Sequence, residues 1–237
     1  MSHDDAVRTR FAQNAGAFVS HTLAQVEPLR ERLATFLAPL RGDELVLDAG
    51  CGPGTLALAL APLVGAVAGV DLVPELLAEA RKHAPLNATF HEGDATALAF
   101  EDGAFDLACS RRTIHHVGRP ELAVSELARV TKLGGRVLVD DQIAPPDPLQ
   151  AFELDRFERR RDPSHNRTLS DGDLRDLFAA NGLALLRSQH FTQRRELDDF
   201  LARAGCVGAE AEAAKDLSPG DREHYVVDTA WYLCEKR

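Results

Sequence analysis

The chain has 237 residues, of which 45% are hydrophobic and 27% are charged, a composition typical of a globular domain with a large buried core rather than of a disordered chain. Its formal net charge of −10 argues against nucleic acid or an anionic membrane as the main partner, because both ligands require basic surfaces. We therefore expect neither partner.

The cysteines and the apolar runs indicate the compartment. The cysteines form no CxxC pair, and no histidine lies near them at metal-ligand spacing. We therefore expect reduced, buried thiols and no metal site, at Cys51, Cys109, Cys206 and Cys234. The first residues lack an apolar leader segment, and the longest apolar run, residues 56–70, is interrupted by Pro62 and two glycines. The sequence thus predicts a cytoplasmic protein without a membrane span.

The first forty residues have the apolar spacing of helices. Val7, Phe11, Ala15 and Phe18 recur at helical intervals, and a second helix is predicted over residues 26–40. The phenylalanines of this segment are candidates for a lid over a binding site, although most phenylalanines at such spacing belong to a core.

From residue 41 to residue 142, short apolar runs alternate with helical segments. The predicted strands are residues 44–50, 66–71, 88–94, 105–110 and 134–141. The predicted helices between them are residues 55–63, 74–84 and 119–132. Because strands that alternate with helices form βαβ units, the sequence predicts an α/β fold with a parallel sheet covered on both faces.

Residues 143–168 interrupt this alternation with a proline-rich and then strongly charged segment. We expect an excursion over the sheet, not a second domain. Its basic residues alternate with acids, which is typical of a solvated helix face, at Arg156, Arg159, Arg160 and Arg161. Beyond it, Ser170 and Gly182 predict the two ends of a capped helix, and residues 183–193 and 224–236 predict the last strands.

The segment DAGCGPG, residues 48–54, follows the first predicted strand of the sheet. Ligands of doubly wound sheets bind beyond such strand ends. A dinucleotide fingerprint requires glycine at position 55, which is threonine, and a phosphate loop requires a lysine, which is absent before Lys82. The next two strands end in Asp71, which could accept hydrogen bonds from a ribose diol, and Asp94, which could contact an adenine amino group. Such an acidic pocket favours an adenosine with a positive centre over a pyrophosphate.

Four stretches in register over residues 41–142 carry a family resemblance: VLDAGCGPGTLALALA, GVDLVPELLAEAR, GDATALAFEDGAFDLACSRRTIHHV and ELARVTKLGGRVLVDD. Together they resemble the class I S-adenosylmethionine-dependent methyltransferases, in particular the small-molecule group related to ubiquinone/menaquinone-biosynthesis methyltransferases. RDPSHNRTLS, residues 161–170, also resembles one subgroup of these enzymes.

The resemblance implies a Rossmann-like, seven-stranded, mostly parallel sheet with one antiparallel strand in a single domain. Residues 1–40 would form a helical lid and residues 41–142 the cofactor-binding core. Residues 143–168 would form a cap on the acceptor side, and residues 169–237 would complete the sheet.

The resemblance also implies which residues bind S-adenosylmethionine. Gly50 and Gly52 would pack against its methionine portion, and Asp48 would contact that portion or order the loop. Asp71 would bind the ribose hydroxyls, and Leu72 would lie against adenine. The remaining contacts are implied at the adenine edge and on the methyl side, at Asp94, Ala95, Ser110 and Arg111.

Methyl transfer from a sulfonium is an in-line displacement with a neutral leaving group, so it needs no metal and gains mostly from proximity, alignment and exclusion of water. A general base matters only where the acceptor's proton is hard to remove. The candidate bases are His115, His116 and His165. The alternative for His115 and His116 is that one of them orders the loop while the other caps the next helix. The alternative for His165 is that it contacts the substrate or orders its own loop.

Two further sets of charged residues are open to more than one interpretation. Arg111 and Arg112 could steer an anionic acceptor, but an internal ion pair of Arg111 with a pocket carboxylate is the preferred interpretation. Asp140 and Asp141 could meet the acceptor, but we expect them to cap and solvate the end of their strand.

The sequence thus predicts an enzyme that transfers a methyl group from S-adenosylmethionine to O, C or N of a small molecule. Two alternatives stay open. An NAD-dependent oxidoreductase would share the sheet and Asp71, and a non-catalytic S-adenosylmethionine-binding regulatory protein would bind the cofactor without turnover.

Overall fold

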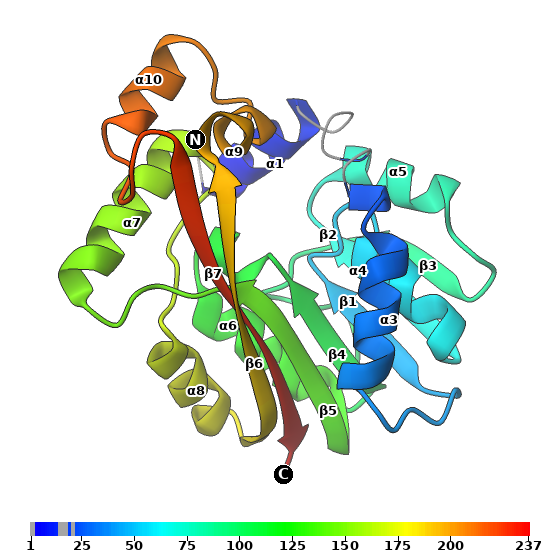
Figure 1. Cartoon of the computed structure of the whole chain (residues 1–237). Coiled ribbons are helices and arrows are strands. Elements are labelled where there is room, and N and C mark those ends of the chain that lie inside the picture. The colour runs from blue at the N-terminus through cyan, green and yellow to red at the C-terminus, as the bar shows by residue number, and fades with distance from the viewer. Residues whose placement is uncertain (1–2, 14–18, 20–21) are drawn as a thin grey trace.

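A seven-stranded sheet forms the centre of the molecule (Figure 1). The computed structural model describes residues 3–13, 19 and 22–237. The strand order is β3-β2-β1-β4-β5-β7-β6, with β1 (Leu45–Ala49), β2 (Ala66–Asp71), β3 (Ala88–Glu92), β4 (Phe105–Arg111), β5 (Thr131–Gln142), β6 (Leu183–Glu196) and β7 (His224–Lys236). Strands β1 to β5 pair in parallel, and β7 pairs antiparallel with both β5 and β6. The predicted mixed sheet is confirmed.

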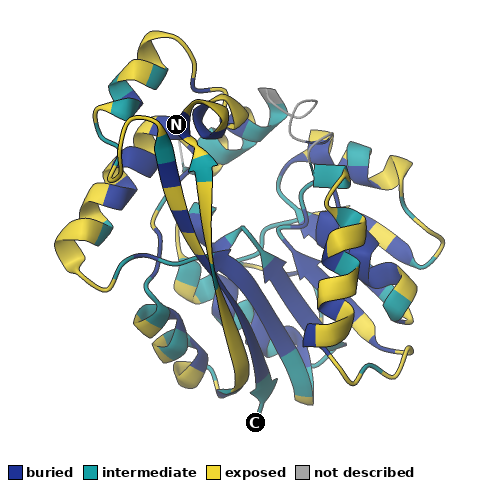
Figure 2. Cartoon of the chain, viewed as in Figure 1, coloured by how far each residue is buried: buried dark blue, intermediate teal, exposed yellow. Residues whose placement is uncertain are grey.

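Helices cover both faces of this sheet, so the central strands are buried (Figure 2). One core cluster joins the sheet to α3 (Val26–Phe36), α4 (Thr55–Leu60) and α5 (Pro74–Lys82). A second cluster joins it to α6 (Pro120–Val130) and α8 (Asp171–Ala180). The strand order reverses between β1 and β4, and the loops after these strands therefore diverge and leave a crevice at the carboxyl edge.

A third cluster forms a helical lobe above that edge, made of α7 (Pro148–Arg161), α9 (Leu197–Arg203), α10 (Ala209–Lys215) and the ends of β6 and β7 (Figure 1). Its centre is the stack of Phe157, Phe200 and Tyr225. The sequence patterns predicted neither α9 nor α10, because each has only seven residues and so contains barely two turns of apolar periodicity. The proline-rich excursion supplies α7 to this lobe.

Element boundaries agree with the sequence in most places. Ser170 and Asp173 form a capping box at the start of α8, and Gly182, with φ +68°, follows its end. The helix predicted to reach residue 40 ends at Phe36 instead, because a residue that precedes a proline, here Pro39, disfavours helical backbone. Similarly, β5 begins at Thr131, which pairs with Phe105, and not at residue 134.

Two other expectations concern single residues. All four cysteines are buried and free, as the composition indicated. Of the four apolar positions of the first predicted helix, Val7 and Phe11 lie in α1 (His3–Gln13), whereas Ala15 and Phe18 lie outside the described residues.

No helix in the described part of the chain is long and apolar enough to cross a membrane.

The prediction of a solvated face for the charged run of α7 is wrong for four of the seven charged residues in that run. Arg156, Arg159 and Arg160 are exposed, but Asp155, Glu158, Arg161 and Asp162 are buried. The buried charges are paired. Arg161 Nη2 lies 2.6 Å from Glu158 Oε2, and the other carboxylate oxygen of Glu158 accepts a hydrogen bond from the Tyr225 hydroxyl at 2.8 Å. Buried charges persist only with such partners, and one of these partners, Tyr225, lies on the distant strand β7.

Candidate active site

The loop between β1 and α4 makes a tight turn at the carboxyl edge of the sheet. Gly50, Gly52 and Gly54 have φ angles of +73°, +53° and +86°, in the left-handed region that glycine adopts without steric strain. The N–H of Gly50 donates to the Val70 carbonyl at 2.8 Å, and the N–H of Gly52 donates to Asp71 Oδ2 at 2.7 Å. The loop is therefore fixed to the end of β2.

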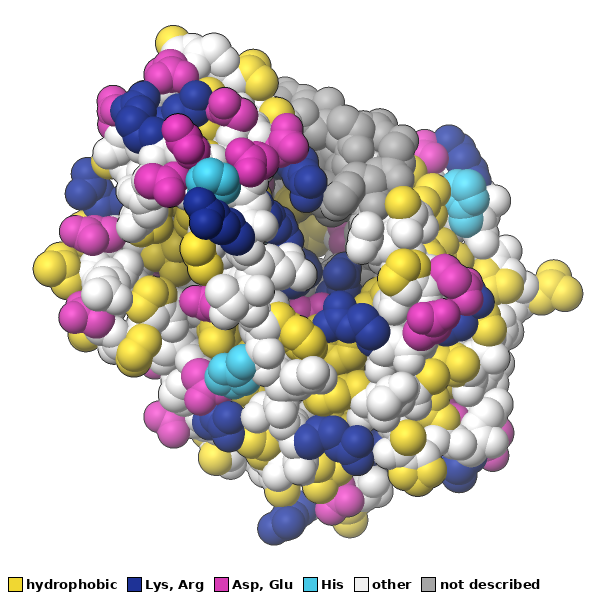
Figure 3. All heavy atoms as spheres, viewed as in Figure 1, with side chains coloured by type: hydrophobic (Ala, Val, Ile, Leu, Met, Phe, Trp, Pro, Cys, Tyr) yellow, Lys and Arg dark blue, Asp and Glu magenta, His cyan; other side chains and the backbone are white. Residues whose placement is uncertain are grey.

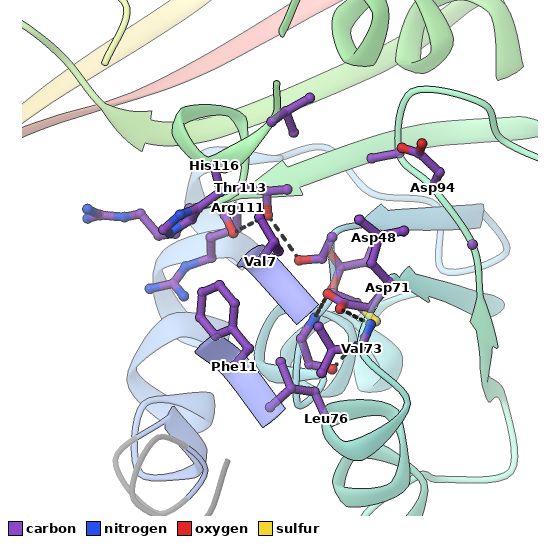
Figure 4. Close-up of a pocket in the computed structure, with 18 of the residues that line it drawn as sticks. Val7, Phe11, Asp48, Asp71, Val73, Leu76, Asp94, Arg111, Thr113 and His116 are labelled. Atoms are coloured by element: carbon purple, nitrogen blue, oxygen red, sulfur yellow. Dashed lines mark hydrogen bonds between the residues drawn. The ribbon is translucent and has the colours of Figure 1, made fainter. Parts of the chain in front are cut away.

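One cavity extends from this loop to the loop after β4 (Figure 4). The loops after β1, β2, β3 and β4 form its wall together with α1. The structure brings most of the predicted site residues to this wall: Asp48, Gly50, Gly52, Asp71, Leu72, Asp94, Ala95, Arg111 and His116. The others, Ser110, His115 and His165, are buried behind it.

Asp71 and Asp94 lie after β2 and β3, at one side of the cavity. Asp71 Oδ1 accepts from the Val73 N–H at 2.9 Å, and Asp94 Oδ1 accepts from the Thr96 N–H at 2.7 Å. Burial raises the pKa of Asp71, while the backbone N–H bonds to it act in the opposite direction. Each carboxylate is held in place by backbone donors and keeps further lone pairs, so Asp71 can accept two hydrogen bonds from a vicinal diol.

Asp48 lies deeper, beneath the glycine loop. Its side chain is 1% exposed, and Oδ2 accepts from the Ala57 N–H at 3.0 Å near the start of α4. Burial raises the pKa of Asp48 to about 7, against the hydrogen bond from Ala57 and the charge of Arg111. This carboxyl group therefore orders the loop and responds to positive charge brought into the cavity.

Arg111 forms the predicted internal ion pair, but its partner is Asp140. Arg111 Nε lies 3.0 Å from Asp140 Oδ2. Asp140 and its neighbour Asp141 are 3% and 2% exposed, so the expectation that they solvate the strand end is wrong. The loop after β4 covers that end and places its own positive and polar groups against both carboxylates.

His115 and His165 are both fixed by buried carboxylates. His115 Nδ1 bonds to Asp141 Oδ1, and the other oxygen of Asp141 accepts from the Ile114 N–H at 2.7 Å. His165 Nε2 donates to Asp155 Oδ1 at 2.9 Å. Each histidine thus orders its own loop. Neither member of the adjacent pair caps the next helix, whose N-cap residue is Arg119.

His116 reaches the cavity wall (Figure 4). Its Nδ1 lies 3.1 Å from the carbonyl oxygen of Ser164, and because a carbonyl only accepts, Nδ1 carries the proton and Nε2 has the free lone pair. The Phe11 ring of α1 packs edge-on against the imidazole at 5.2 Å. Burial, and then the neighbouring His115, lower the pKa of His116, so the ring is neutral near pH 7.

Sequence reasoning did not single out Thr113 as a site residue. Its hydroxyl lies 3.0 Å from the carbonyl oxygen of Gly50 and it lines the cavity. No sequence signal marked it, because a lone threonine in a loop has no spacing pattern. Phe11, by contrast, was a lid candidate on its helical spacing, and it does line the cavity. Phe36 belongs to the core instead.

Comparison of the sequence with known proteins identifies its family. A methyltransferase-domain family model matches residues 47–139, the region that supplies all the strand ends around the cavity. The methyltransferase YcgJ of Bacillus subtilis is 34% identical over 224 residues, which are 92% of this chain and 83% of YcgJ. The chain belongs to the class I S-adenosylmethionine-dependent methyltransferases.

Solved structures support this methyltransferase assignment. The structure of YcgJ superimposes with a TM-score of 0.80 at 28% identity and covers 89% of this chain and 99% of YcgJ. Protein BH2331 of Bacillus halodurans C-125 gives a TM-score of 0.81 at 26% identity over 87% of this chain and 98% of that protein. The quinone-biosynthesis methyltransferase UbiE of Bdellovibrio bacteriovorus is 38% identical over 115 residues, 46% of this chain and 48% of UbiE. S-adenosylmethionine is therefore the methyl donor of this enzyme, and the oxidoreductase alternative is wrong.

Proposed function

We propose that this methyltransferase transfers the methyl group of S-adenosylmethionine in line onto a small-molecule acceptor held between the loop after β4 and α1. The observation that carries the proposal is the polarity of one continuous cavity. Carboxylates of Asp71 and Asp94 lie on one side, and the guanidinium groups of Arg111 and Arg112 with His116 line the loop after β4. This distribution suits a ligand with an adenosine at one end and a carboxylate at the other.

The residues fit S-adenosylmethionine in detail. Asp71 would bind the ribose hydroxyls, and Leu72, Asp94 and Ala95 would surround the adenine. Gly50 and Gly52 hold the loop in a left-handed turn whose backbone would face the methionine portion, and Arg111 would pair with its carboxylate. When bound, the cofactor supplies an electrophilic methyl group on a sulfonium.

His116 is the group that we assign to the acceptor. Its Nε2 lone pair can accept a hydrogen bond from the acceptor's X–H group and direct the nucleophile. Ser164, whose carbonyl holds Nδ1, donates its own hydroxyl to Asp162 Oδ1 at 2.5 Å. The negative charge of Asp162 partly offsets the burial and the neighbouring His115, which disfavour the protonated ring, so His116 would hold a proton only briefly before passing it on. His115 and His165 would support this arrangement without touching the acceptor.

The decisive experiment is a calorimetric titration with S-adenosylmethionine and S-adenosylhomocysteine. Asp71→Ala should weaken both by roughly tenfold to a hundredfold, because one pair of charged hydrogen bonds is lost. Asp71→Asn keeps the shape of the loop anchor, and the exposed Asp102→Ala is the matched control. Unchanged affinity in both Asp71 variants would contradict the placement of the cofactor. Formation of S-adenosylhomocysteine in the presence of a panel of small molecules tests methyl transfer itself.

A further inference from the structure

Helix α1 contacts the two sides of the molecule that flank the site. On the face shown in Figure 3, the surface is hollowed between the helical lobe and the α3–α5 side. On the lobe side, Arg10 Nη2 of α1 lies 3.2 Å from Oδ2 of Asp162, the residue that follows α7. On the other side, Arg8 Nη1 donates to Glu92 Oε1 at 3.0 Å, at the end of β3. The helix is therefore anchored to both sides while it lines the cavity.

The two anchors of α1 differ in their exposure. The side chains of Arg10 and Asp162 are 7% and 5% exposed, whereas those of Arg8 and Glu92 are 41% and 53% exposed. In the described part of the chain, the three apolar core clusters contain no residue of α1. An exposed ion pair contributes little to stability, but loss of one member of a buried pair is costly. Docking of α1 against the lobe therefore depends mainly on Arg10.

The carboxylate that Arg10 contacts also orders the turn beside His116. Asp162 Oδ1 accepts from the Ser164 N–H at 3.0 Å and from the Ser164 hydroxyl at 2.5 Å. The carbonyl oxygen and the hydroxyl oxygen of Ser164 each lie 3.1 Å from His116 Nδ1. One series of polar contacts thus leads from α1, through the turn at Ser164, to the imidazole.

Two other side chains of α1 contact His116 itself. The Phe11 ring packs edge-on against the imidazole (Figure 4), with ring centres 5.2 Å apart and planes at 84°. His3 Nε2 donates to the backbone carbonyl oxygen of His116 at 2.6 Å. His3 and Arg10 are seven residues apart, which is about two helical turns, so both lie on one side of α1. The docked helix therefore contacts the ring, the backbone and the hydrogen-bond partner of His116.

We propose that α1 positions His116 for the acceptor and that Arg10 is the positioning residue; this inference rests on the proposed function. While α1 is docked, Ser164 keeps the proton on Nδ1 and the Nε2 lone pair stays free for the acceptor. Without the Arg10–Asp162 pair, the turn at Ser164 loses a fixed partner, and the imidazole can rotate or change its tautomer. The residues assigned to the methyl donor lie on the loops after β1, β2 and β3, so they do not depend on this pair.

The experiment uses the full chain, isotopically labelled on its histidine nitrogens and saturated with S-adenosylhomocysteine. Long-range nitrogen–proton NMR correlations show which ring nitrogen of His116 carries the proton, and the spectrum of His116→Gln assigns the signals. The variants are Arg10→Gln and its matched control Arg8→Gln, which breaks the exposed ion pair of the same helix. We expect the Nδ1–H form to predominate in wild type and in Arg8→Gln. Arg10→Gln should raise the ratio of Nε2–H to Nδ1–H by about tenfold or more, because the equivalent of one hydrogen bond is lost.

Activity distinguishes positioning from a merely structural role. With an acceptor found in the panel of small molecules, Arg10→Gln should lower kcat by about tenfold or more, because a misplaced group loses its alignment with the acceptor. Arg10→Lys keeps the ion pair and should recover most of this loss. The affinity for S-adenosylhomocysteine should stay close to that of wild type in both variants. A merely structural role would lower stability and leave the tautomer and kcat per folded molecule unchanged.

The outcomes separate this inference from the proposed function. An unchanged tautomer ratio or an unchanged kcat in Arg10→Gln overturns the positioning inference alone. Equal decreases of kcat and of S-adenosylhomocysteine affinity also overturn it, because α1 would then be a general cover of the cavity. Absence of S-adenosylhomocysteine binding in wild type overturns the proposed function. Should Arg10→Gln fail to fold, His3→Ala removes the bond to the His116 carbonyl instead, and a rise of the Nε2–H form is again expected; no rise would overturn the inference.

Discussion

Thr113 packs directly against Gly50. Its Oγ1 lies 3.0 Å from the Gly50 carbonyl oxygen, and a Cβ on Gly50 would lie 2.2 Å from Thr113 Cγ2. The contact joins the loop after β1 to the loop after β4. Because the first loop carries the residues that we propose for the donor and the second carries Arg111, Arg112 and His116, this one glycine sets the spacing between the two loops that line the cavity.

Gly50→Ala should therefore lower the free energy of unfolding more than its backbone angle alone predicts. A non-glycine residue at positive φ costs about 1–2 kcal/mol, and the clash with Thr113 adds to this. Gly134→Ala is the control, since Gly134 has φ +72° but no neighbour within 4 Å of an added Cβ. Urea denaturation of both variants checks the difference, and equal losses would contradict the contact. Affinity for S-adenosylhomocysteine should decrease only in Gly50→Ala.

Asp48 should make stability depend on pH. Its pKa is raised to about 7 in the folded chain, above its value of about 3.9 when unfolded, so the folded state holds a proton that the unfolded state has released. Its contribution is present below pH 4 and is lost as the pH rises through 7, roughly 4 kcal/mol in all. Urea denaturation of Asp48→Asn between pH 4.5 and 8 should show a flatter dependence, with a gain at pH 8. A slope equal to that of wild type would exclude Asp48 as its source.

The same carboxyl group should distinguish the charged cofactor from its neutral product. A sulfonium in the cavity favours the ionised form of Asp48, so binding of S-adenosylmethionine near pH 7 should release a proton. S-adenosylhomocysteine lacks the charge and should release less. Calorimetry in buffers of different ionisation enthalpy measures this release, and Asp48→Asn should abolish the difference. Equal proton release by the two ligands in wild type would show that Asp48 does not sense the sulfonium.

The sequence was sufficient to predict that Asp71, Asp94 and the glycine loop lie together around one cavity. Asp71 and Asp94 each end an apolar strand, and parallel strands in one sheet end at one edge, so their proximity follows from the pattern alone. The glycine loop was equally visible, because its failure to complete the dinucleotide fingerprint disfavoured a pyrophosphate. These features depend on neighbours within two consecutive βαβ units, and local spacing records them.

The side of the cavity that we propose for the acceptor was not predictable in the same way. Which histidine reaches the cavity depends on Asp141, which holds His115 away from it and lies 26 residues along the chain. The burial of Glu158 depends on the Tyr225 hydroxyl, 67 residues away. A run of charged residues has the same sequence pattern whether its side chains are exposed to water or are buried against distant partners. Only the folded lobe decides between these possibilities.

Asp162 should anchor α1 to the helical lobe. Asp162 Oδ2 lies 3.2 Å from Arg10 Nη2, both groups being buried, and Oδ1 accepts from the Ser164 N–H at 3.0 Å. Burial alone would raise the pKa of Asp162, but the charges of Arg10 and Arg161 and the hydrogen bond from the Ser164 hydroxyl lower it. Its stabilisation is therefore complete above about pH 4 and is lost as the pH falls further. Asp162→Asn should lose about 3 kcal/mol at pH 7 and progressively less towards pH 3. Chemical denaturation measures both, with the exposed Asp216→Asn as a control that should change little.

His116→Gln should lower kcat for an acceptor that must lose a proton by about a hundredfold, without changing the affinity for S-adenosylhomocysteine. The reason is the tautomer, because Nε2 has the free lone pair on the cavity wall while Ser164 holds Nδ1. His165→Gln is the matched control: His165 is buried against Asp155, so this change should lower stability and leave kcat per folded molecule close to that of wild type.

Since burial and His115 lower the pKa of His116, the wild-type rate should show no titration of this group between pH 6 and 8. An acidic limb near pH 6.5 that His116→Gln removes would contradict the neutral ring, and equal loss of kcat in both variants would contradict the assignment of His116 to the acceptor.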